Sequence, residues 1–398
     1  MKQHPKSACL FLCLAVAPVM AHAAESDALA IDANIQALHV PYGTIIDPIF
    51  ASPSSNQVVG YTRCGDSAIW TGHYLAAEAF RYSVTEAPDA LTNIQNAIAG
   101  IQGLVDVTGT DVLARCQVPL NSPYAAGIQS EEAANGIFTN STTGYFWVGN
   151  TSRDEYSGVF FGLAVAYDLV NDASVQSSIS QLATRMLNFL VSHAWTVVMP
   201  NGSISTTFLI RPDQELALLE IGQHVNNGQF GGTYSLTRDL LGFTVPVPIG
   251  VDAASLSSYF KFNLDYINLY NLIRLGGNGP GGAYKAAYDI VRNYTASHQN
   301  AFFDIIDHGL NGVNAARDDE TLDLLQEWLG RPRRDPTVNL NGVVGACGTE
   351  ACQPVPVPLR PPTDFLWQRD PFQLSGGGSD IIEGAGIDYI LPYWMARY

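Results

Sequence analysis

The sequence predicts an all-α fold of stacked helical hairpins, and two patterns along its 398 residues support this. Apolar residues recur at intervals of three and four over segments of helical length, and short breaks separate these segments in pairs. An Arg and an Asp stand repeatedly in the polar turn that precedes an apolar segment. A phrase repeated at helix starts indicates stacked hairpins whose polar loops gather at one end.

The repeated opening occurs four times. The copies are Arg63-Cys64-Gly65-Asp66, Arg153-Asp154, Arg211-Pro212-Asp213 and Arg317-Asp318. The residues that follow the first two copies are also similar: Trp70-Thr71-Gly72-His73-Tyr74 aligns with Tyr156-Ser157-Gly158-Val159-Phe160. We therefore expect functional chemistry at the end of the fold where these turns meet.

The N-terminus has the features of a cleavable secretory signal. Residues 1–23 contain two lysines, an apolar run over 8–20 and the small-residue ending Ala21-His22-Ala23. The run is too short to span a bilayer, and no later stretch reaches the roughly 18 apolar residues that a membrane helix needs. We predict a secreted or periplasmic protein, with residues 24–65 forming an irregular segment that holds one short helix over 31–38.

The remaining chain, 66–398, is predicted to be a single domain because no linker or charge block divides it. The expected helix pairs are 67–82 with 89–104, 155–169 with 175–195 and 256–275 with 283–297, with further helices at 214–223, 236–241, 300–309, 319–329 and 386–396. The first helix of a pair tends to be apolar all round, whereas the second is amphipathic. This contrast favours an inner and an outer ring, which makes a toroid.

A long irregular insert, 331–383, interrupts the helical pattern near the C-terminus. It is rich in Pro, contains a triple glycine and has no helical periodicity. Long structureless inserts in compact domains are usually functional. We predict that it forms a lid or rim across the mouth of the toroid.

Four cysteines remain after removal of the signal, an even set in an oxidising compartment. Of the three possible pairings, Cys347 with Cys352 and Cys64 with Cys116 keeps both loops local, so we expect these two disulfides. A metal site is less favoured because no second close cysteine pair and no His at ligand spacing occur. No phosphate-binding or dinucleotide motif is present, and we expect no cofactor.

The formal net charge of −17 argues against nucleic acid or an anionic membrane as the partner. Nothing in the sequence indicates the oligomeric state.

Taken together, an exported, acidic and aromatic-rich chain of helical hairpins resembles the (α/α)6 toroids of six-hairpin glycoside hydrolases and polysaccharide lyases. The resemblance is one of architecture and covers most of the mature chain. It implies an oligo- or polysaccharide substrate, and no family residue is carried over. Fold alone does not establish the chemistry.

Hydrolysis of a glycosidic bond requires one protonated and one ionised carboxyl group. Asp154 and Asp66 are the preferred pair, because matching places in adjacent hairpins would bring them to one rim; Asp318 and Glu383 are further candidates. The structural alternative is that each Asp at a helix start only caps the first turn.

Substrate contacts are predicted for arginines of the repeated openings and for aromatic residues near the mouth. They are Arg153, Arg211, Arg317, Trp70, Trp147, Tyr156 and Trp367. The structural alternatives are that the arginines clamp neighbouring hairpins and that the aromatic residues anchor the core.

Two other functions remain open. In a polysaccharide lyase, the arginines would neutralise a uronate while Tyr156 or His298 moves a proton. In a non-catalytic saccharide-binding protein, the same loops would bind without a carboxyl group of displaced pKa.

Overall fold

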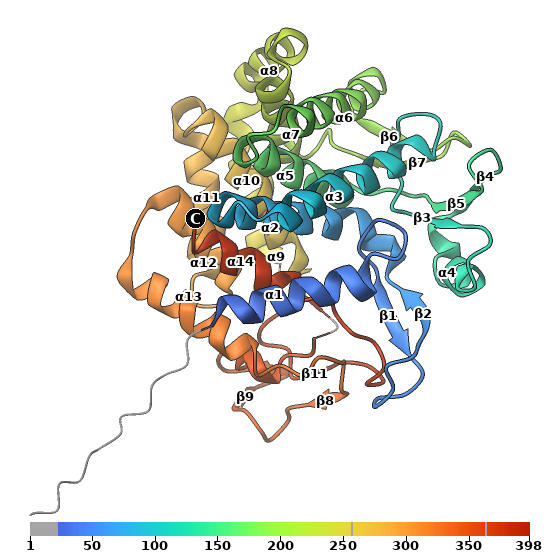
Figure 1. The fold of residues 1–398 in the computed structure, drawn as a ribbon. Helices are drawn as coiled ribbons and strands as arrows, with labels where there is room; N and C mark the ends of the chain where they lie inside the picture. The colour runs from blue at the N-terminus through green and yellow to red at the C-terminus, as the bar shows by residue number, and fades with distance from the viewer. Residues whose placement is uncertain (1–22, 256–257, 363) are drawn as a thin grey trace, which may run out of the picture.

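The computed structural model describes residues 23–255, 258–362 and 364–398 (Figure 1). Residues 1–22, which make up nearly all of the predicted signal, lie outside the described residues. Within the described ranges, no helix is both long and apolar enough to cross a membrane.

The described chain is mostly helical, which confirms the coarse fold class. The helices are α1 Glu25–Asn34, α2 Ser67–Thr85, α3 Pro88–Asp106, α4 Ala125–Glu131, α5 Arg153–Leu169, α6 Ala173–Ser192, α7 Pro212–Val225, α8 Asn227–Leu241, α9 Pro246–Ser255, α10 Phe260–Gly276, α11 Ala283–Thr295, α12 Ala301–Asn311, α13 Ala315–Trp328 and α14 Ile387–Met395. The helix predicted over 31–38 begins earlier and ends in a π-helical turn, η1 (Ile35–His39).

Short antiparallel strands stand in the loops, so the prediction of an all-α chain is accurate only in outline. They are β1 Asp47–Phe50, β2 Val58–Thr62, β3 Cys116–Pro119, β4 Ile137–Asn140, β5 Tyr145–Val148, β6 Thr196–Val198, β7 Ile204–Thr207, β8 Val338–Asn339, β9 Ala346–Cys347, β10 Glu350–Ala351 and β11 Ser375–Gly376. The pairings are β1 with β2, β5 between β3 and β4, β6 with β7, β8 with β11 and β9 with β10. Figure 1 shows β1 to β7 together at one side of the helices.

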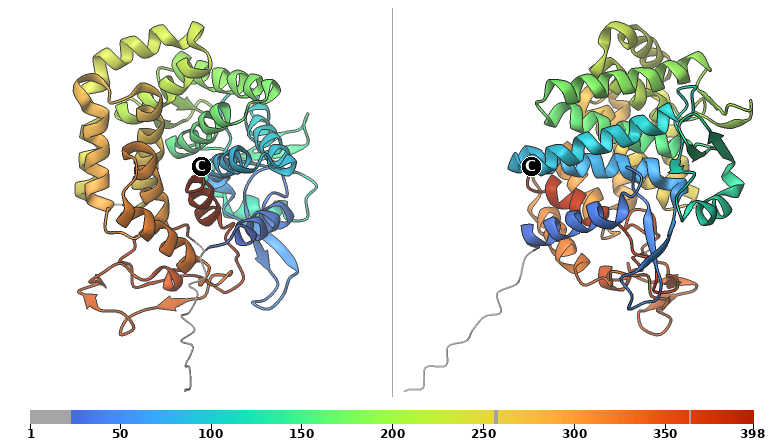
Figure 2. Two further views of the ribbon diagram at one scale, coloured as in Figure 1. Left: turned by 60° about the vertical axis from the view of Figure 1, so that its left-hand side comes forward. Right: turned by 45° about the vertical axis from the view of Figure 1, so that its right-hand side comes forward.

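Six helices form the interior. α2 packs against α5, α5 against α7, α7 against α10, α10 against α12, α12 against α14 and α14 against α2. Figure 2 shows α14 between α2 and α12. Each of the six also contacts a more peripheral helix, in the order α3, α6, α8, α11, α13 and α1. The sequence predicted that the first helix of each pair lies inside, and α2 agrees with this prediction, because every residue from Ser67 to Arg81 is buried.

Glycines let α2 and α5 approach backbone to backbone. A Cβ on Gly72 would lie 1.9 Å from the carbonyl oxygen of Gly158, and one on Gly162 would lie 2.2 Å from the carbonyl oxygen of Gly72. Only Gly permits such an approach. The crossing fixes the spacing of the two helices whose first turns carry Asp66 and Asp154.

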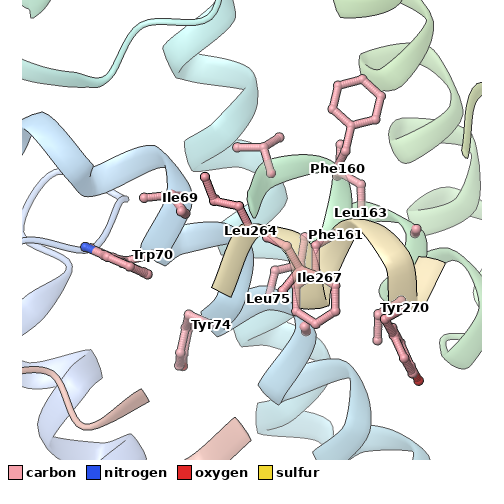
Figure 3. Packing of buried hydrophobic residues seen from close by; sticks show 14 of the residues in the cluster. Ile69, Trp70, Tyr74, Leu75, Phe160, Phe161, Leu163, Leu264, Ile267 and Tyr270 are labelled. Carbon is pink, nitrogen blue, oxygen red and sulfur yellow. The ribbon is translucent and has the colours of Figure 1, made fainter. Parts of the chain in front are cut away.

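Aromatic and aliphatic side chains fill the space between the inner helices (Figure 3). The ring of His73 on α2 lies 5.4 Å from that of Phe161 on α5 and 6.1 Å from that of Phe302 on α12. His73 also bonds Asn263 of α10 at 3.2 Å. Burial lowers the pKa of His73 to about 4, so it is a neutral core residue.

Candidate functional site

Asp66 and Asp154 lie at the N-terminal ends of α2 and α5, the two helices locked by the glycine crossing. Asp66 ends the 3₁₀ turn η2 (Cys64–Asp66) and is the N-cap residue of α2. Asp154 is the second residue of α5. Burial raises the pKa of Asp66, and the negative charge of Asp154 adds to this rise, which places Asp154 near Asp66.

Neither carboxylate caps its helix. The Asp66 side chain makes no capping bond. α5 is capped by Ser152, whose Oγ accepts from the Asp154 amide at 3.3 Å, and by Glu155, whose carboxylate accepts from the Ser152 amide at 3.0 Å. The capping interpretation therefore does not hold for the preferred pair.

The two side chains also lack other strong partners among the described residues. The nearest cation to Asp66 is Arg115, whose Nη1 lies 3.7 Å from the carboxylate, and the Asp66 side chain is 46 % exposed. Partial burial raises the pKa of Asp66, with Arg115 opposing the shift. Burial likewise raises the pKa of Asp154, against the lowering effect of Arg153, Arg115 and Arg211.

Arg115 is a site residue that the sequence reasoning missed. Its guanidinium donates to the carbonyl oxygen of Gly65 at 2.6 Å, to that of Asn150 at 2.9 Å and to Glu155 at 2.6 Å. It thereby ties the turn before α2 to the turn before α5. A signal existed, because Arg63-Cys64 and Arg115-Cys116 repeat the same dipeptide and the disulfide between them brings the two arginines into one region.

Arg153 and Arg211 lie near each other but differ in their surroundings. Arg153 donates to the carbonyl oxygen of Thr207 at 2.9 Å in β7. Arg211 is buried and bonds Asp213 at 2.7 Å and Asp265 at 2.8 Å, with Asp252 as a third partner. The guanidinium of Arg211 is therefore bonded to three aspartates at the centre of an ion cluster. Its charge still lowers the pKa of Asp154, but Arg211 makes no direct bond to that carboxylate.

The four aromatic candidates prove to be core residues, which corrects the stacking prediction. Trp70, Trp147, Tyr156 and Trp367 are at most 4 % exposed. Trp70 packs edge-on against Phe365 of the insert at 4.8 Å, and the Tyr156 hydroxyl accepts from the Leu113 amide at 3.1 Å. The sequence alone could not distinguish an aromatic side chain exposed at the helix ends from one buried beneath them.

The fourth copy of the repeat does not join the other three. Asp318 and Arg317 begin α13, a peripheral helix, and Asp318 accepts from His308 at 3.0 Å near the C-terminal end of α12. The N-terminal end of α12 lies by the insert, because Asn300 donates to the carbonyl oxygen of Leu366 at 3.2 Å. Asp318 is thus about 16 Å, one length of α12, from that end. The hydrogen bond from His308 and the charge of Arg317 outweigh burial and lower the pKa of Asp318.

Glu383 is an ion-pair partner rather than a free acid. Its carboxylate accepts from Asn34 at 2.8 Å and from Arg333 at 3.0 Å, and it lies 3.9 Å from His39. Burial raises the pKa of Glu383, but these partners outweigh it and bring the pKa to about 2. His39 also lies 3.3 Å from Asp47. The contacts among Arg333, Glu383, His39 and Asp47 therefore connect the insert to the N-terminal segment.

His298, the other lyase candidate, lies apart from the carboxylate pair. It lines a cavity of about 270 Å³ with Tyr259, Tyr294 and Phe372. Burial lowers the pKa of His298 to about 4.

The two disulfides form as predicted. Cys64 pairs with Cys116 across a Cα–Cα distance of 5.4 Å, and Cys347 pairs with Cys352 across 4.9 Å. In the portion of the chain that the structure describes, no three His, Cys, Asp or Glu residues are arranged to hold a metal ion.

Comparison of the chain with protein-family models, with curated proteins and with solved structures gave no match.

Proposed function

We propose that this chain is an exported (α/α)6 toroid that hydrolyses a glycosidic bond in an oligo- or polysaccharide, with Asp66 and Asp154 as its carboxyl pair. The closed series of contacts from α2 through α14 and back to α2 supports the toroid. The predicted signal and the two disulfides support export to a secreted or periplasmic location.

One observation carries the catalytic assignment. Asp213, Asp318 and Glu383 are each held by an Arg at hydrogen-bond distance, whereas Asp66 and Asp154 have no hydrogen-bonded side-chain partner among the described residues. Neither carboxylate caps a helix, and the only ion pair of either one in the described part of the chain is the 3.7 Å contact of Asp66 with Arg115, so no close structural contact explains the two groups.

The electrostatics of the pair suit general acid and base chemistry. Burial raises the pKa of Asp66 and that of Asp154, and the charge of Asp154 adds to the rise at Asp66, which favours a protonated carboxyl group in the pair. The charges of Arg115 and Arg153 favour ionisation of the second group. One protonated and one ionised carboxyl group are what glycoside hydrolysis needs.

Substitution of each carboxylate tests the proposal. Release of reducing ends from a panel of polysaccharides would be measured for the wild type and for Asp66→Asn and Asp154→Asn, with Asp319→Asn, an exposed Asp on α13, as the matched control. We expect each of the first two to lose about 10²–10⁴-fold in rate and the control to keep wild-type activity. An Asp154→Asn enzyme of normal turnover would end the proposal.

Elimination from a uronate-containing glycan is the second candidate, favoured by Arg115 and Arg153 beside the pair. A product with the ultraviolet absorbance of an unsaturated uronate would identify it. Tyr156 is fully buried in the core, so its hydroxyl cannot reach a substrate to move the proton in that reaction. Binding without catalysis, the third possibility, predicts carbohydrate affinity with no product from any substrate.

A further inference from the structure

A long groove runs along α2, between α1 and η1 on one side and α3 on the other. Two neighbouring cavities, of about 540 and 530 Å³, share Gln36 and Asn93 in their linings. Thr71, Tyr74 and Arg81 of α2 line one or the other, so the groove follows α2 for several turns. The fifteen residues of α2 from 71 to 85 extend over roughly 21 Å.

The larger cavity is lined without any charged side chain. It presents four amides, three tyrosines and a threonine: Gln36, Asn93, Asn96, Gln117, Tyr42, Tyr74, Tyr145 and Thr71. An amide offers both donors and an acceptor, as a sugar hydroxyl does, and a tyrosine offers an apolar face with a polar tip. This combination suits an uncharged, hydroxyl-rich ligand.

Three of these side chains are free to contact a ligand. The side chains of Asn96 on α3, Gln117 on β3 and Tyr145 on β5 make no hydrogen bond to any other described residue. They come from three separate elements and converge on the same cavity. Polar side chains that hydrogen-bond one another have no capacity left for a ligand. Asn96, Gln117 and Tyr145 do not bond one another, so their donors and acceptors are available to a ligand.

The walls of the groove are held at a fixed spacing by Arg81. Its guanidinium donates to Asp32 of α1 at 2.8 Å and to Glu78 of α2 at 3.0 Å, and it pairs with Asp89 of α3. Asn93 of α3 adds a bond to Glu78 at 3.0 Å. A groove whose two walls are joined through its floor is preorganised, which lowers the cost of binding.

We propose that this groove binds a linear, uncharged oligosaccharide as a second site, separate from the Asp66 and Asp154 pair. The acidic residues around Arg81 disfavour a uronate, and the amides and tyrosines interspersed among small apolar residues such as Val40 and Ala97 suit a hydroxyl-rich ligand better than the continuous apolar face of an amphipathic helix. The groove would hold a neutral polymer on the surface. This site does not depend on the chain being a hydrolase.

Binding would be measured by calorimetry on the Asp154→Asn protein, so that the ligand is not consumed. The probes are cellohexaose, xylohexaose, mannohexaose and maltohexaose, with hexagalacturonate as the acidic comparison. We expect at least one neutral probe to bind and hexagalacturonate to bind more weakly. Asn96→Ala and Gln117→Ala should each weaken binding of that neutral probe about fivefold, the effect of one hydrogen bond.

Gln95→Ala is the matched control. It removes the same amide from the adjacent residue of α3, which lines a different depression with Gln102 and Ser178, and it should leave the affinity unchanged. Absence of binding by all four neutral probes would overturn the proposal. So would binding that Asn96→Ala and Gln117→Ala leave intact, or polar hexapeptides binding with the same dependence while the sugars do not. Because affinity is measured without turnover, failure here is distinct from loss of the hydrolase assignment.

Discussion

The contact between α2 and α5 can be tested by adding a single methyl group. In Gly72→Ala the new Cβ would lie 1.9 Å from the carbonyl oxygen of Gly158, 2.3 Å from its carbonyl carbon and 2.7 Å from the amide nitrogen of Val159. All three are backbone atoms, so no side-chain rotation relieves the overlap. The two helices must move apart by about 1.5 Å to restore ordinary contact at 3.4 Å.

The cost follows from overpacking. Inserting a methyl group into a close-packed core usually costs about 1–3 kcal/mol, and overlap with three backbone atoms of α5 places Gly72→Ala at or above the top of that range. Alanine regains about 1 kcal/mol of helix propensity over glycine. The expected net loss is therefore about 2 kcal/mol or more, out of a typical domain stability of about 5–15 kcal/mol.

Urea unfolding followed by far-ultraviolet circular dichroism measures the change. Gly232→Ala is the matched control, because Gly232 also lies within a helix, α8, and its Cβ would meet nothing within 4 Å. That variant should gain up to about 1 kcal/mol. If Gly72→Ala unfolds at the same urea concentration as Gly232→Ala, the close approach of α2 and α5 is wrong.

Three further perturbations follow from the charges and cross-links. Arg211→Met leaves buried Asp213 and Asp265 without their ion-pair partner, while Asp252 keeps Lys261 at 3.1 Å, and should cost about 3–5 kcal/mol in thermal unfolding at neutral pH. Burial raises the pKa of Asp265, so the cost should be smaller in acid, where Asp265 takes up a proton; an equal cost at both pH values would contradict the ion cluster. Burial lowers the pKa of His39, but its flanking carboxylates outweigh burial and raise it above 6.5, so the stability it adds is complete below pH 6.5 and is lost as the pH rises through the higher folded value. The stability difference between wild type and His39→Gln should therefore shrink from pH 6 to pH 9, and a constant difference would show that His39 does not titrate with folding. Cys64→Ser breaks a cross-link between residues 52 apart and should cost about 2–4 kcal/mol, more than Cys347→Ser, whose link spans 5 residues; urea midpoints in the reverse order would refute the loop-entropy argument.

The helices were predictable from sequence because apolar residues recur at three- and four-residue intervals, as the amphipathic helices α3 and α6 illustrate. The strands were not, because runs such as Thr196–Val198 are too short to show alternation and lie among turn residues. Their pairing is a tertiary property.

The candidate site was predictable in part. Matching positions in adjacent hairpins predicted that Asp66 and Asp154 would lie in one region, and the two residues stand at the starts of α2 and α5, which pack together. The same argument failed for Asp318, because the repeated Arg-Asp motif does not show whether the helix that it precedes is an inner or a peripheral one. Arg115 was missed because it has no Asp beside it and so falls outside the Arg-Asp repeat, although the Arg-Cys dipeptide that it shares with Arg63 and the predicted Cys64–Cys116 disulfide pointed to it.

The packed centre of the helical assembly limits how a polymer could be handled. The rings of His73, Phe161 and Phe302 meet where a tunnel would otherwise pass between the inner helices. A long chain therefore has no exit at the far side and cannot be threaded through the molecule. Under the proposed function, a polymer would lie on the outer surface, across the helix ends or along the groove beside α2, and any fragment would depart on the side from which the chain approached.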